Sequence, residues 1–253
     1  MISPADFSDP DFQTGKMILV DKPYGWTSFD VVGKIRGMIT RKLKERIKTG
    51  HAGTLDPLAT GLLIICTGKY TKRIDEPQEL EKEYTGTFVL GATTPSFDLE
   101  TEIVSQTPFQ HVTEKEIDKA TEAIRSADYQ IPPSYSAVFV KGKRAYKYAR
   151  KQIDINIPPK PVRIHIFEIT RIQLPECDFR IVCSKGTYIR AVARDFGEIL
   201  GVGAYLTVLR RTRIGNYSVE SAFSMQTIET VLSQQISPEE SFQRNQIIAE
   251  NDK

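Results

Sequence analysis

Segments with helix-like and strand-like spacing of apolar residues follow one another along this chain without a regular strand–helix–strand order. Helix-like spacing occurs after Thr27 and Ser28, either of which can cap a helix, and over residues 113–124 and 188–200. Strand-like patterns occupy residues 17–20, 83–90, 163–174 and 179–183. Because parallel sheets are built from regular βαβ crossovers, this order predicts an α+β fold with a mixed, mostly antiparallel sheet flanked by helices.

The sequence has the features of neither a membrane protein nor a secreted one. Its 253 residues can form one large domain or two small ones. It contains no run of 18 apolar residues, and its acidic N-terminus lacks the apolar stretch of a secretion signal. Cys66, Cys177 and Cys183 are an odd number without a CxxC pair, which argues against a disulfide framework or a cysteine zinc site. We therefore expect a cytoplasmic protein that does not bind membranes.

Positive charge is concentrated in the middle of the chain, although the whole chain carries a net charge of only +2. Residues 1–15 contain three Asp and no Lys or Arg, and residues 219–253 contain six acidic and two basic residues. Residues 16–218 therefore carry a net charge of +9. A basic segment of this kind is typical of proteins that bind polyanions, and a merely solvated surface is the alternative.

A glycine-containing loop, GHAGTLDPLATGLL at residues 50–63, holds the first candidate catalytic residue. Pro57 biases Asp56 toward an extended conformation, so its carboxylate can be held on a constrained loop. The competing interpretation is an Asp that only caps a turn. His51 could contact a base or a phosphate, or simply be solvated. Widely spaced histidines and the absence of phosphate-loop, dinucleotide and GxSxG motifs give no support to a metal, nucleotide or serine-hydrolase site.

Lysines and arginines form three clusters within the basic middle of the chain. Residues 34–48 contain seven of them against one acidic residue, and residues 141–151 contain six and no acidic residue. Tyr135, Tyr146 and Tyr148 lie in or near the second cluster, and a third cluster follows Leu209. Cations neutralise phosphates and aromatic rings stack on unpaired bases, so these clusters favour RNA or single-stranded DNA as a partner.

Six sequence blocks occur in an order that resembles one known family. They are DKPYGWTSFDVV (21–32), GHAGTLDPLATGLL (50–63), KEYTGTFVLGATTPSFDLE (82–100), PPSYSAVFVKGKRAYKYAR (132–150), KGTYIRAVARDFG (185–197) and GAYLTVLRRTRIG (203–215). Together they resemble tRNA pseudouridine synthase B, the bacterial family that isomerises the T-loop uridine at position 55 of tRNA. The resemblance covers residues 17–218 and implies a pseudouridine synthase fold with a thumb-like RNA-binding insertion at about 130–155.

The resemblance also implies roles for individual residues. Asp56 matches the catalytic aspartate, Tyr84 the tyrosine that helps to move a sugar proton, and Arg190 the arginine that pairs with the aspartate. The implied substrate-binding residues are Lys22 and Pro23, which would support the pocket, His51, which would help to open the T-loop, and the pocket-lining Tyr188 and Leu209. The resemblance implies neither a cofactor nor a metal, since every atom of the base and the sugar stays in the product.

The implied partner is the T-stem-loop of tRNA, without a guide RNA, and we expect the protein to be a monomer. The target base must be flipped out of its stack at a cost of about a few kcal/mol, which phosphate contacts would help to offset. The cations expected to make such contacts are Arg41, Lys42, Lys44, Lys143, Arg144, Lys147, Arg150, Arg210 and Arg211.

The chain departs from the family pattern in the insertion and after the last block. Phe139 replaces the usual Lys, and Lys151 and Gln152 stand where the family usually has Gly. Only about 35 residues follow the last block, too few for the RNA-binding PUA domain of many members. We therefore expect a catalytic domain at residues 16–218, a mobile acidic arm at 1–15 and a short acidic tail at 219–253.

Three other functions compete with an RNA-modifying isomerase. An RNA chaperone would grip and refold tRNA, but it would not need Asp56, Tyr84 and Arg190 together. A guide-RNA-dependent catalytic subunit would need added RNA or protein to act on free tRNA. A hydrolytic N-glycosidase would release free uracil.

Overall fold

The computed structural model describes residues 12–233, in which nine strands form one mixed sheet. The strand order is β11-β12-β4-β13-β3-β1-β15, with β14 paired to β13 and β2 paired to β3. The β1–β15 and β3–β13 pairs are parallel, and the other pairs are antiparallel. The predicted α+β class with a mixed, mostly antiparallel sheet is therefore confirmed.

The main sheet consists of β1 (Met17–Lys22), β2 (Thr49–Ala52), β3 (Thr60–Thr67), β4 (Lys82–Leu90), β11 (Ile164–Gln173), β12 (Glu176–Cys183), β13 (Ala204–Ile214), β14 (Tyr217–Ser218) and β15 (Phe223–Ser224). Short strands outside it are β5 (Ala92–Thr93), β6 (Ser105–Gln106), β7 (Tyr129–Gln130), β8 (Phe139–Val140), β9 (Lys143–Arg144) and β10 (Lys160–Pro161). The helices are α1 (Ser28–Leu43), α2 (Asp75–Glu79), α3 (Glu114–Arg125), α4 (Tyr146–Ala149), α5 (Ile189–Ile199) and α6 (Met225–Ser233), with 3₁₀ turns η2 (Gly68–Arg73) and η3 (Val219–Ser221). All segments predicted above are present, and β2 forms where a loop was expected because it pairs with β3.

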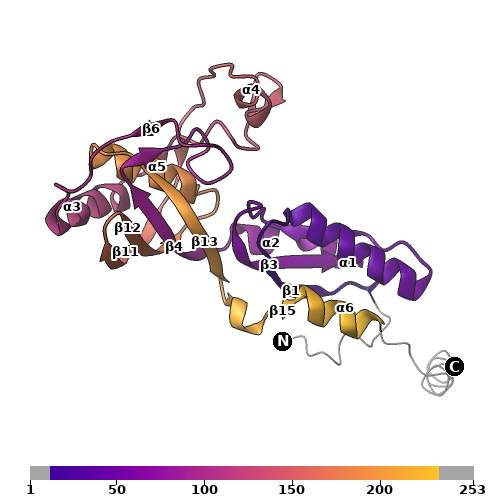
Figure 1. The fold of residues 1–253 in the computed structure, drawn as a ribbon. Helices are drawn as coiled ribbons and strands as arrows, with labels where there is room; N and C mark the ends of the chain where they lie inside the picture. The colour runs from indigo at the N-terminus through magenta and orange to yellow at the C-terminus, as the bar shows by residue number, and fades with distance from the viewer. Residues whose placement is uncertain (1–11, 234–253) are drawn as a thin grey trace, which may run out of the picture.

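The sheet divides into two halves, each with its own helices and core (Figure 1). One half contains β11, β12, β4 and most of β13, with α3 and α5 packed on it. The other contains β1, β2, β3 and β15 with α1 and α6. The halves meet where β13 and β3 share two residue pairs, Arg210–Thr60 and Arg211–Gly61. Glycine is required at Gly61, since its φ is +103° and a Cβ would lie 2.3 Å from the Arg211 carbonyl oxygen.

Side-chain caps begin the two helices whose starts are clearest in the sequence. Thr27 accepts a hydrogen bond from the Asp30 amide, and the Asp30 carboxylate accepts one from the Thr27 amide, so the two residues form a capping box. Thr113 and Glu116 form the same arrangement before α3, as predicted. Caps of this kind satisfy amide groups that the helix itself leaves unpaired, and each is worth about 1 kcal/mol.

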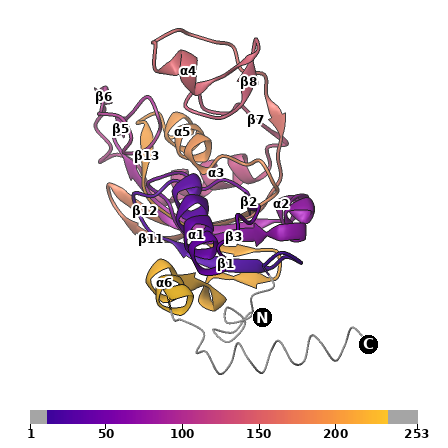
Figure 2. The ribbon, with the colours of Figure 1, turned by 90° about the vertical axis from the view of Figure 1, so that its right-hand side faces the viewer.

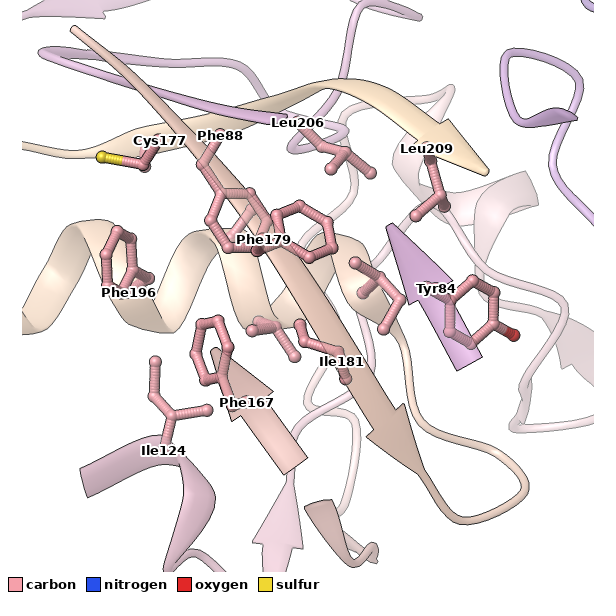
Figure 3. Close-up of a cluster of buried hydrophobic side chains, with 14 of the residues drawn as sticks. Tyr84, Phe88, Ile124, Phe167, Cys177, Phe179, Ile181, Phe196, Leu206 and Leu209 are labelled. Atoms are coloured by element: carbon pink, nitrogen blue, oxygen red, sulfur yellow. The ribbon is translucent and has the colours of Figure 1, made fainter. Parts of the chain in front are cut away.

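An aromatic cluster fills the core between the sheet and α5 (Figure 3). The Phe88 and Phe179 rings stack with centroids 4.1 Å apart, and Phe196 of α5 lies 5.5 Å from Phe88. Each of these side chains is fully or almost fully buried, which contributes about 1.5–3 kcal/mol per ring. Tyr84 and Leu209 lie at one end of the cluster, with the Tyr84 hydroxyl directed away from it (Figure 3). The core thus ends at the edge of a cavity described below.

Residues 129–161, which include the insertion expected at about 130–155, project from the sheet and carry α4 at the tip (Figure 2). Its ends pair as β7 and β10, and the β8–β9 hairpin lies between them. A small apolar cluster of Val138, Ala145 and Ile157 gives it a core of its own. Gln152 has a φ of +54°, a left-handed conformation that favours glycine. This matches the position at which the resembling family usually has Gly.

The part of the chain that the structure describes extends beyond both expected domain boundaries. Phe12, assigned to the acidic arm, is fully buried in the core of the second half. Residues 219–233, assigned to the acidic tail, form η3, β15 and α6, and Ile228 and Leu232 are buried beside α1. Residues 1–11 and 234–253 lie outside the described part of the chain. Among residues 12–233, no helix has the length and apolar character needed to cross a membrane, and all three cysteines are unpaired and buried.

Candidate active site

A cavity of about 870 Å³ opens where the two halves of the sheet meet. Asp56 reaches it from the loop between β2 and β3, Tyr84 from β4, and Arg190 from the start of α5. Tyr188 and Leu209 also line it, as the sequence analysis expected. Asp56 and Arg190, which are 134 positions apart in the sequence, therefore converge on one space.

Hydrogen bonds to the main chain of Leu55 and Pro57 hold the loop that carries Asp56. Ser28 accepts a hydrogen bond from the Leu55 amide at 2.9 Å and donates one to the Leu55 carbonyl oxygen at 3.1 Å. On the other side of Asp56, the Pro57 carbonyl oxygen accepts from the Gly25 amide at 2.9 Å and from Lys22 Nζ at 3.2 Å. The carboxylate itself is 38% exposed. The loop is thus fixed on both sides of a side chain that stays open to the cavity.

Arg190 is the central cation of the site. Its Nε atom lies 2.9 Å from Asp56 Oδ2 and 3.5 Å from Asp98 Oδ2. Burial works to lower the pKa of Arg190, but the Asp56 and Asp98 carboxylates raise it above its ordinary value. A guanidinium that stays charged beside Asp56 fixes the orientation of its carboxylate.

The remaining nitrogens of Arg190 bind main-chain oxygens from two further segments. Nη1 donates to the Ser96 carbonyl oxygen at 3.2 Å, and Nη2 donates to the Tyr135 carbonyl oxygen at 3.0 Å. Tyr135 belongs to the insertion, so the guanidinium ties the insertion to the catalytic loop. The side chain of Arg190 is only 6% exposed.

Asp98 is a site residue that the sequence analysis missed. Its carboxylate is 7% exposed and faces the same guanidinium as Asp56. It follows Phe97, whose φ of +60° places it in a sharp turn closed by the hydrogen bond from the Phe97 amide to the Thr94 carbonyl oxygen. The only sequence signal for Asp98 was its place in the third sequence block (82–100). Its position in the sequence gives no reason to expect a contact with Arg190.

Two tyrosines line the cavity in different ways. Tyr84 is almost fully buried, and this burial raises the pKa of its phenol. Tyr188 occupies the N-cap position of α5, and burial raises its pKa as well. The Gln130 side chain holds the Tyr188 main chain by accepting from its amide at 2.8 Å and donating to its carbonyl oxygen at 3.1 Å. Both phenols therefore stay protonated at neutral pH.

Three predicted substrate-binding residues, Lys22, Pro23 and His51, lie next to the loop between β2 and β3 that carries Asp56. Lys22 is fully buried, and its ammonium group donates to the carbonyl oxygens of Pro23, Trp26 and Pro57. Burial lowers the pKa of Lys22 to about 8 despite the nearby Asp56 carboxylate. Burial also lowers the pKa of His51, whose ring meets the exposed Phe29 edge-on with centroids 5.8 Å apart.

The basic residues predicted to bind RNA fall into two groups. Arg41, Lys44, Lys143, Arg144, Lys147 and Arg150 are exposed, and Lys42 is half-buried. Arg150 stacks on Tyr146 at the cavity and lies 3.8 Å from Glu100.

Arg210 and Arg211 differ from this group. The prediction that Arg211 belongs to an exposed patch is wrong, because it is 1% exposed and donates to the carbonyl oxygens of Leu62, Thr54 and Gly53. Arg210, on the other face of β13, forms a two-point ion pair with Asp21.

The arrangement places the Asp56 carboxylate, two protonated phenols and the buried Arg190 guanidinium around one space. Such a set can act on a neutral planar ring joined to a sugar, with the carboxylate as nucleophile or base and a phenol as proton donor. Within residues 12–233, no group of three or more His, Cys, Asp or Glu side chains is placed to hold a metal ion.

Sequence comparisons match this chain to known proteins over most of its length. A sequence profile described as TruB family pseudouridylate synthase (N terminal domain) matches residues 40–189. A second, described as tRNA pseudouridylate synthase B C-terminal domain, matches residues 190–248. Proteins named tRNA pseudouridine synthase B from Flavobacterium johnsoniae and Phocaeicola vulgatus are 51% and 52% identical to this chain, over 88% and 89% of it and 98% and 96% of their own lengths.

Solved structures show the same fold. A chain in the crystal structure of a Cbf5-Nop10-Gar1 complex matches with a TM-score of 0.63 and 26% identity, over 89% of this chain and 57% of that chain. A chain in the structure of an H/ACA RNP bound to a substrate RNA containing 2'-deoxyuridine matches with a TM-score of 0.56 and 25% identity, over 85% of this chain and 52% of that chain. This chain thus spans little more than half the length of these solved relatives.

Proposed function

This chain belongs to the TruB family of pseudouridylate synthases, and on that premise we propose that it converts the T-loop uridine at position 55 of tRNA into pseudouridine. The observation that carries the proposal is the ion pair between Asp56 and Arg190 at the floor of a cavity large enough for a nucleoside. Relatives of nearly the same length that bear the name tRNA pseudouridine synthase B support tRNA as the substrate.

The reaction needs no external group. The bond between N1 of uracil and C1′ of the ribose breaks, the ring rotates, and a bond from C5 to C1′ forms. The hydrogen on C5 is lost and N1 gains a proton, so atoms and charge balance within the nucleotide and solvent. Asp56 is the nucleophile or base at the substrate, and the hydrogen bond from Arg190 holds its carboxylate in orientation.

The other cavity residues hold the nucleotide while the ring turns. Tyr84 presents its hydroxyl at the end of the aromatic core, where it can contact the flipped uridine and help to move a proton. Tyr188 and Leu209 form walls that exclude water from the reacting atoms. Lys22 supports the catalytic loop through Pro23 and Pro57, and His51 stands beside this loop as the residue that helps to open the RNA.

The insertion supplies the grip on RNA. Its cations Lys143, Arg144 and Lys147 are exposed, and Tyr146 and Arg150 of the same segment line the cavity. Arg41, Lys42 and Lys44 at the end of α1 are a second set of contacts on the other half of the sheet. Phosphate contacts at both sets offset the cost of flipping the base.

The experiment is release of tritium from unmodified tRNA labelled at C5 of uridine. We expect wild-type protein to release tritium and Asp56→Asn to release only background. Asp178→Asn is the matched control, because Asp178 binds Arg171 and Thr87 on the sheet away from the cavity. Equal background release from wild type and Asp56→Asn would refute the enzyme assignment and leave an RNA chaperone.

The same assay separates two other functions. The solved relatives come from complexes titled Cbf5-Nop10-Gar1 and H/ACA RNP, which makes a guided catalytic subunit the second candidate. We expect the purified chain to act on free tRNA without added RNA or protein, and a requirement for either would favour that candidate. Chromatography of the product should detect pseudouridine in the RNA, whereas free uracil would indicate a hydrolytic glycosidase.

A further inference from the structure

Adjacent arginines on β13 have opposite environments. Strand geometry points neighbouring side chains to opposite faces of the sheet. Arg210 is half-exposed and pairs with Asp21, whereas Arg211 is the largest fully buried side chain in the described chain. None of the ion pairs within residues 12–233 includes Arg211. A guanidinium buried without a carboxylate is costly unless oxygen atoms surround it.

Main-chain oxygens from both sides of the Asp56 loop surround this guanidinium. Nε donates to the Leu62 carbonyl oxygen at 2.7 Å, after the loop has joined β3. Nη1 and Nη2 donate to the Thr54 and Gly53 carbonyl oxygens at 3.3 and 3.2 Å, immediately before Leu55 and Asp56. The planar guanidinium therefore spans the two ends of the loop, which a single ammonium group could not do.

The same side chain lies beside the second catalytic candidate. Arg211 and Tyr84 are cross-strand partners in the β13–β4 ladder, so their side chains lie on the same face of the sheet. Both line the cavity, and the positive charge of Arg211 works against the rise that burial causes in the pKa of the Tyr84 phenol. The Tyr84 hydroxyl is directed out of the aromatic core (Figure 3).

We propose that Arg211 is a positioning residue that sets the Asp56 loop and the Tyr84 hydroxyl relative to each other across the boundary between the two halves of the sheet. This role rests on the proposed pseudouridine synthase activity. It explains why a charged residue occupies a fully buried position on β13, where an apolar side chain would pack without the cost of desolvation. Arg211 acts through the two groups it holds and takes no part in bond making.

The test compares Arg211→Lys and Arg211→Gln with wild type in the tritium-release assay under saturating and limiting tRNA. Replacing the planar guanidinium removes hydrogen bonds that hold the Asp56 loop, so the loop and the Tyr84 phenol can shift. A displacement of about 1 Å lowers the rate about 100-fold. We expect kcat to fall about 100-fold in Arg211→Lys and KM to change less than about threefold, because the RNA-gripping surfaces are untouched. Arg180→Lys is the control, since Arg180 pairs with Glu83 and Glu168 on the sheet and should keep its kcat.

Coupling to Tyr84 is measured with the double variant Arg211→Lys, Tyr84→Phe. If Arg211 acts partly through Tyr84, the double variant loses less than the product of the two single losses. Independent losses that multiply would overturn the connection to Tyr84. An unchanged kcat in Arg211→Lys would overturn the proposal altogether, while an inactive wild type would instead refute the proposed function.

A measurement that needs no Arg211 variant covers the case in which Arg211→Lys and Arg211→Gln do not fold. Arg190 and Arg211 are the only buried arginines in residues 12–233. Held by hydrogen bonds to oxygen atoms, both should give slowly exchanging Nε–H signals in ¹⁵N NMR spectra, and Arg190→Lys should remove one of them. If the signal that remains exchanges as fast as those of the surface arginines, Arg211 is not a fixed clamp and the proposal fails.

Discussion

The cavity floor and the insertion above it are both rich in cations, but they hold them in opposite ways. Lys82, Arg190 and Arg211 line the cavity and Lys22 lies behind the Asp56 loop; all four are buried, and their donors point to carbonyl or carboxylate oxygens. Lys143 and the neighbouring cations of the insertion are exposed. Buried cations are bound to the protein itself and therefore define geometry, whereas exposed cations are free to exchange counterions for phosphates.

The largest expected effect comes from Arg190→Gln. Removing the guanidinium leaves Asp56 and Asp98 facing each other without a cation, which should lower kcat about 1,000-fold in the tritium-release assay. Arg194→Gln, one turn later on α5, removes an arginine that stacks on Phe97 and binds Asp195. This control should lower kcat by less than about tenfold, and equal losses would mean that general helix stability, not the ion pair, limits activity.

Tyr84→Phe should give the next largest effect. It removes one hydroxyl from the cavity and leaves the aromatic ring in the core, so folding should be preserved. A positioned proton donor or acceptor is worth about 100-fold or more in turnover. We expect kcat to fall by about this factor and tRNA affinity, measured by filter binding, to stay within about threefold. Comparable losses in affinity and turnover would place the phenol in binding instead of chemistry.

Neutralising Lys143, Arg144 and Lys147 together should affect binding instead of turnover. The slope of log affinity against log salt should fall by about one unit for each phosphate that the variant no longer neutralises. The matched control neutralises Lys115, Lys119 and Arg125, which carry the same charge on α3, a helix well apart from α4 at the tip of the insertion in Figure 1. An unchanged slope in the first variant, or an equal change in the control, would show that the insertion does not grip RNA.

The smallest expected effect is on the free energy of unfolding, which burial of the cations Lys22 and Lys82 lowers. The pKa of Lys22 is about 8 in the folded protein and about 10.5 when unfolded, so the unfolded chain binds more protons between these values. This difference makes the contribution of Lys22 to the unfolding free energy rise with pH from about 8 to about 10.5. The unfolding free energy of Lys22→Met, measured by urea titration at several pH values, should rise less than that of wild type.

Lys82 provides a second case of the same effect. Burial lowers its pKa to about 8 as well, and its ammonium group binds the carbonyl oxygens of Gln78 and Leu80. Lys82→Met should therefore flatten the pH dependence in the same window. If the unfolding free energy changed with pH equally in wild type and in both variants, burial of Lys22 and Lys82 would not reduce stability.

Much of the fold follows from local sequence signals. Capping boxes at Thr27 and Thr113 and the apolar spacing behind them define α1 and α3 without reference to the rest of the chain. Sequence blocks also identified Asp56, Tyr84, Arg190, Tyr188 and Leu209, and the structure brings all five to one cavity. These residues lie in motifs whose composition is distinctive on its own.

The sequence by itself determined the helices, the strands and the residue types available for chemistry, because caps and periodicity act over a few neighbouring positions. Only the tertiary structure decided which cations are buried and which carboxylates share Arg190. Arg210 and Arg211 are the same residue in consecutive positions, and Asp98 is one acidic residue among many. The physical reason is that alternation along a strand assigns a side chain to a face, but the segments packed on that face decide whether its charge meets water, a carboxylate or a ring of carbonyl oxygens.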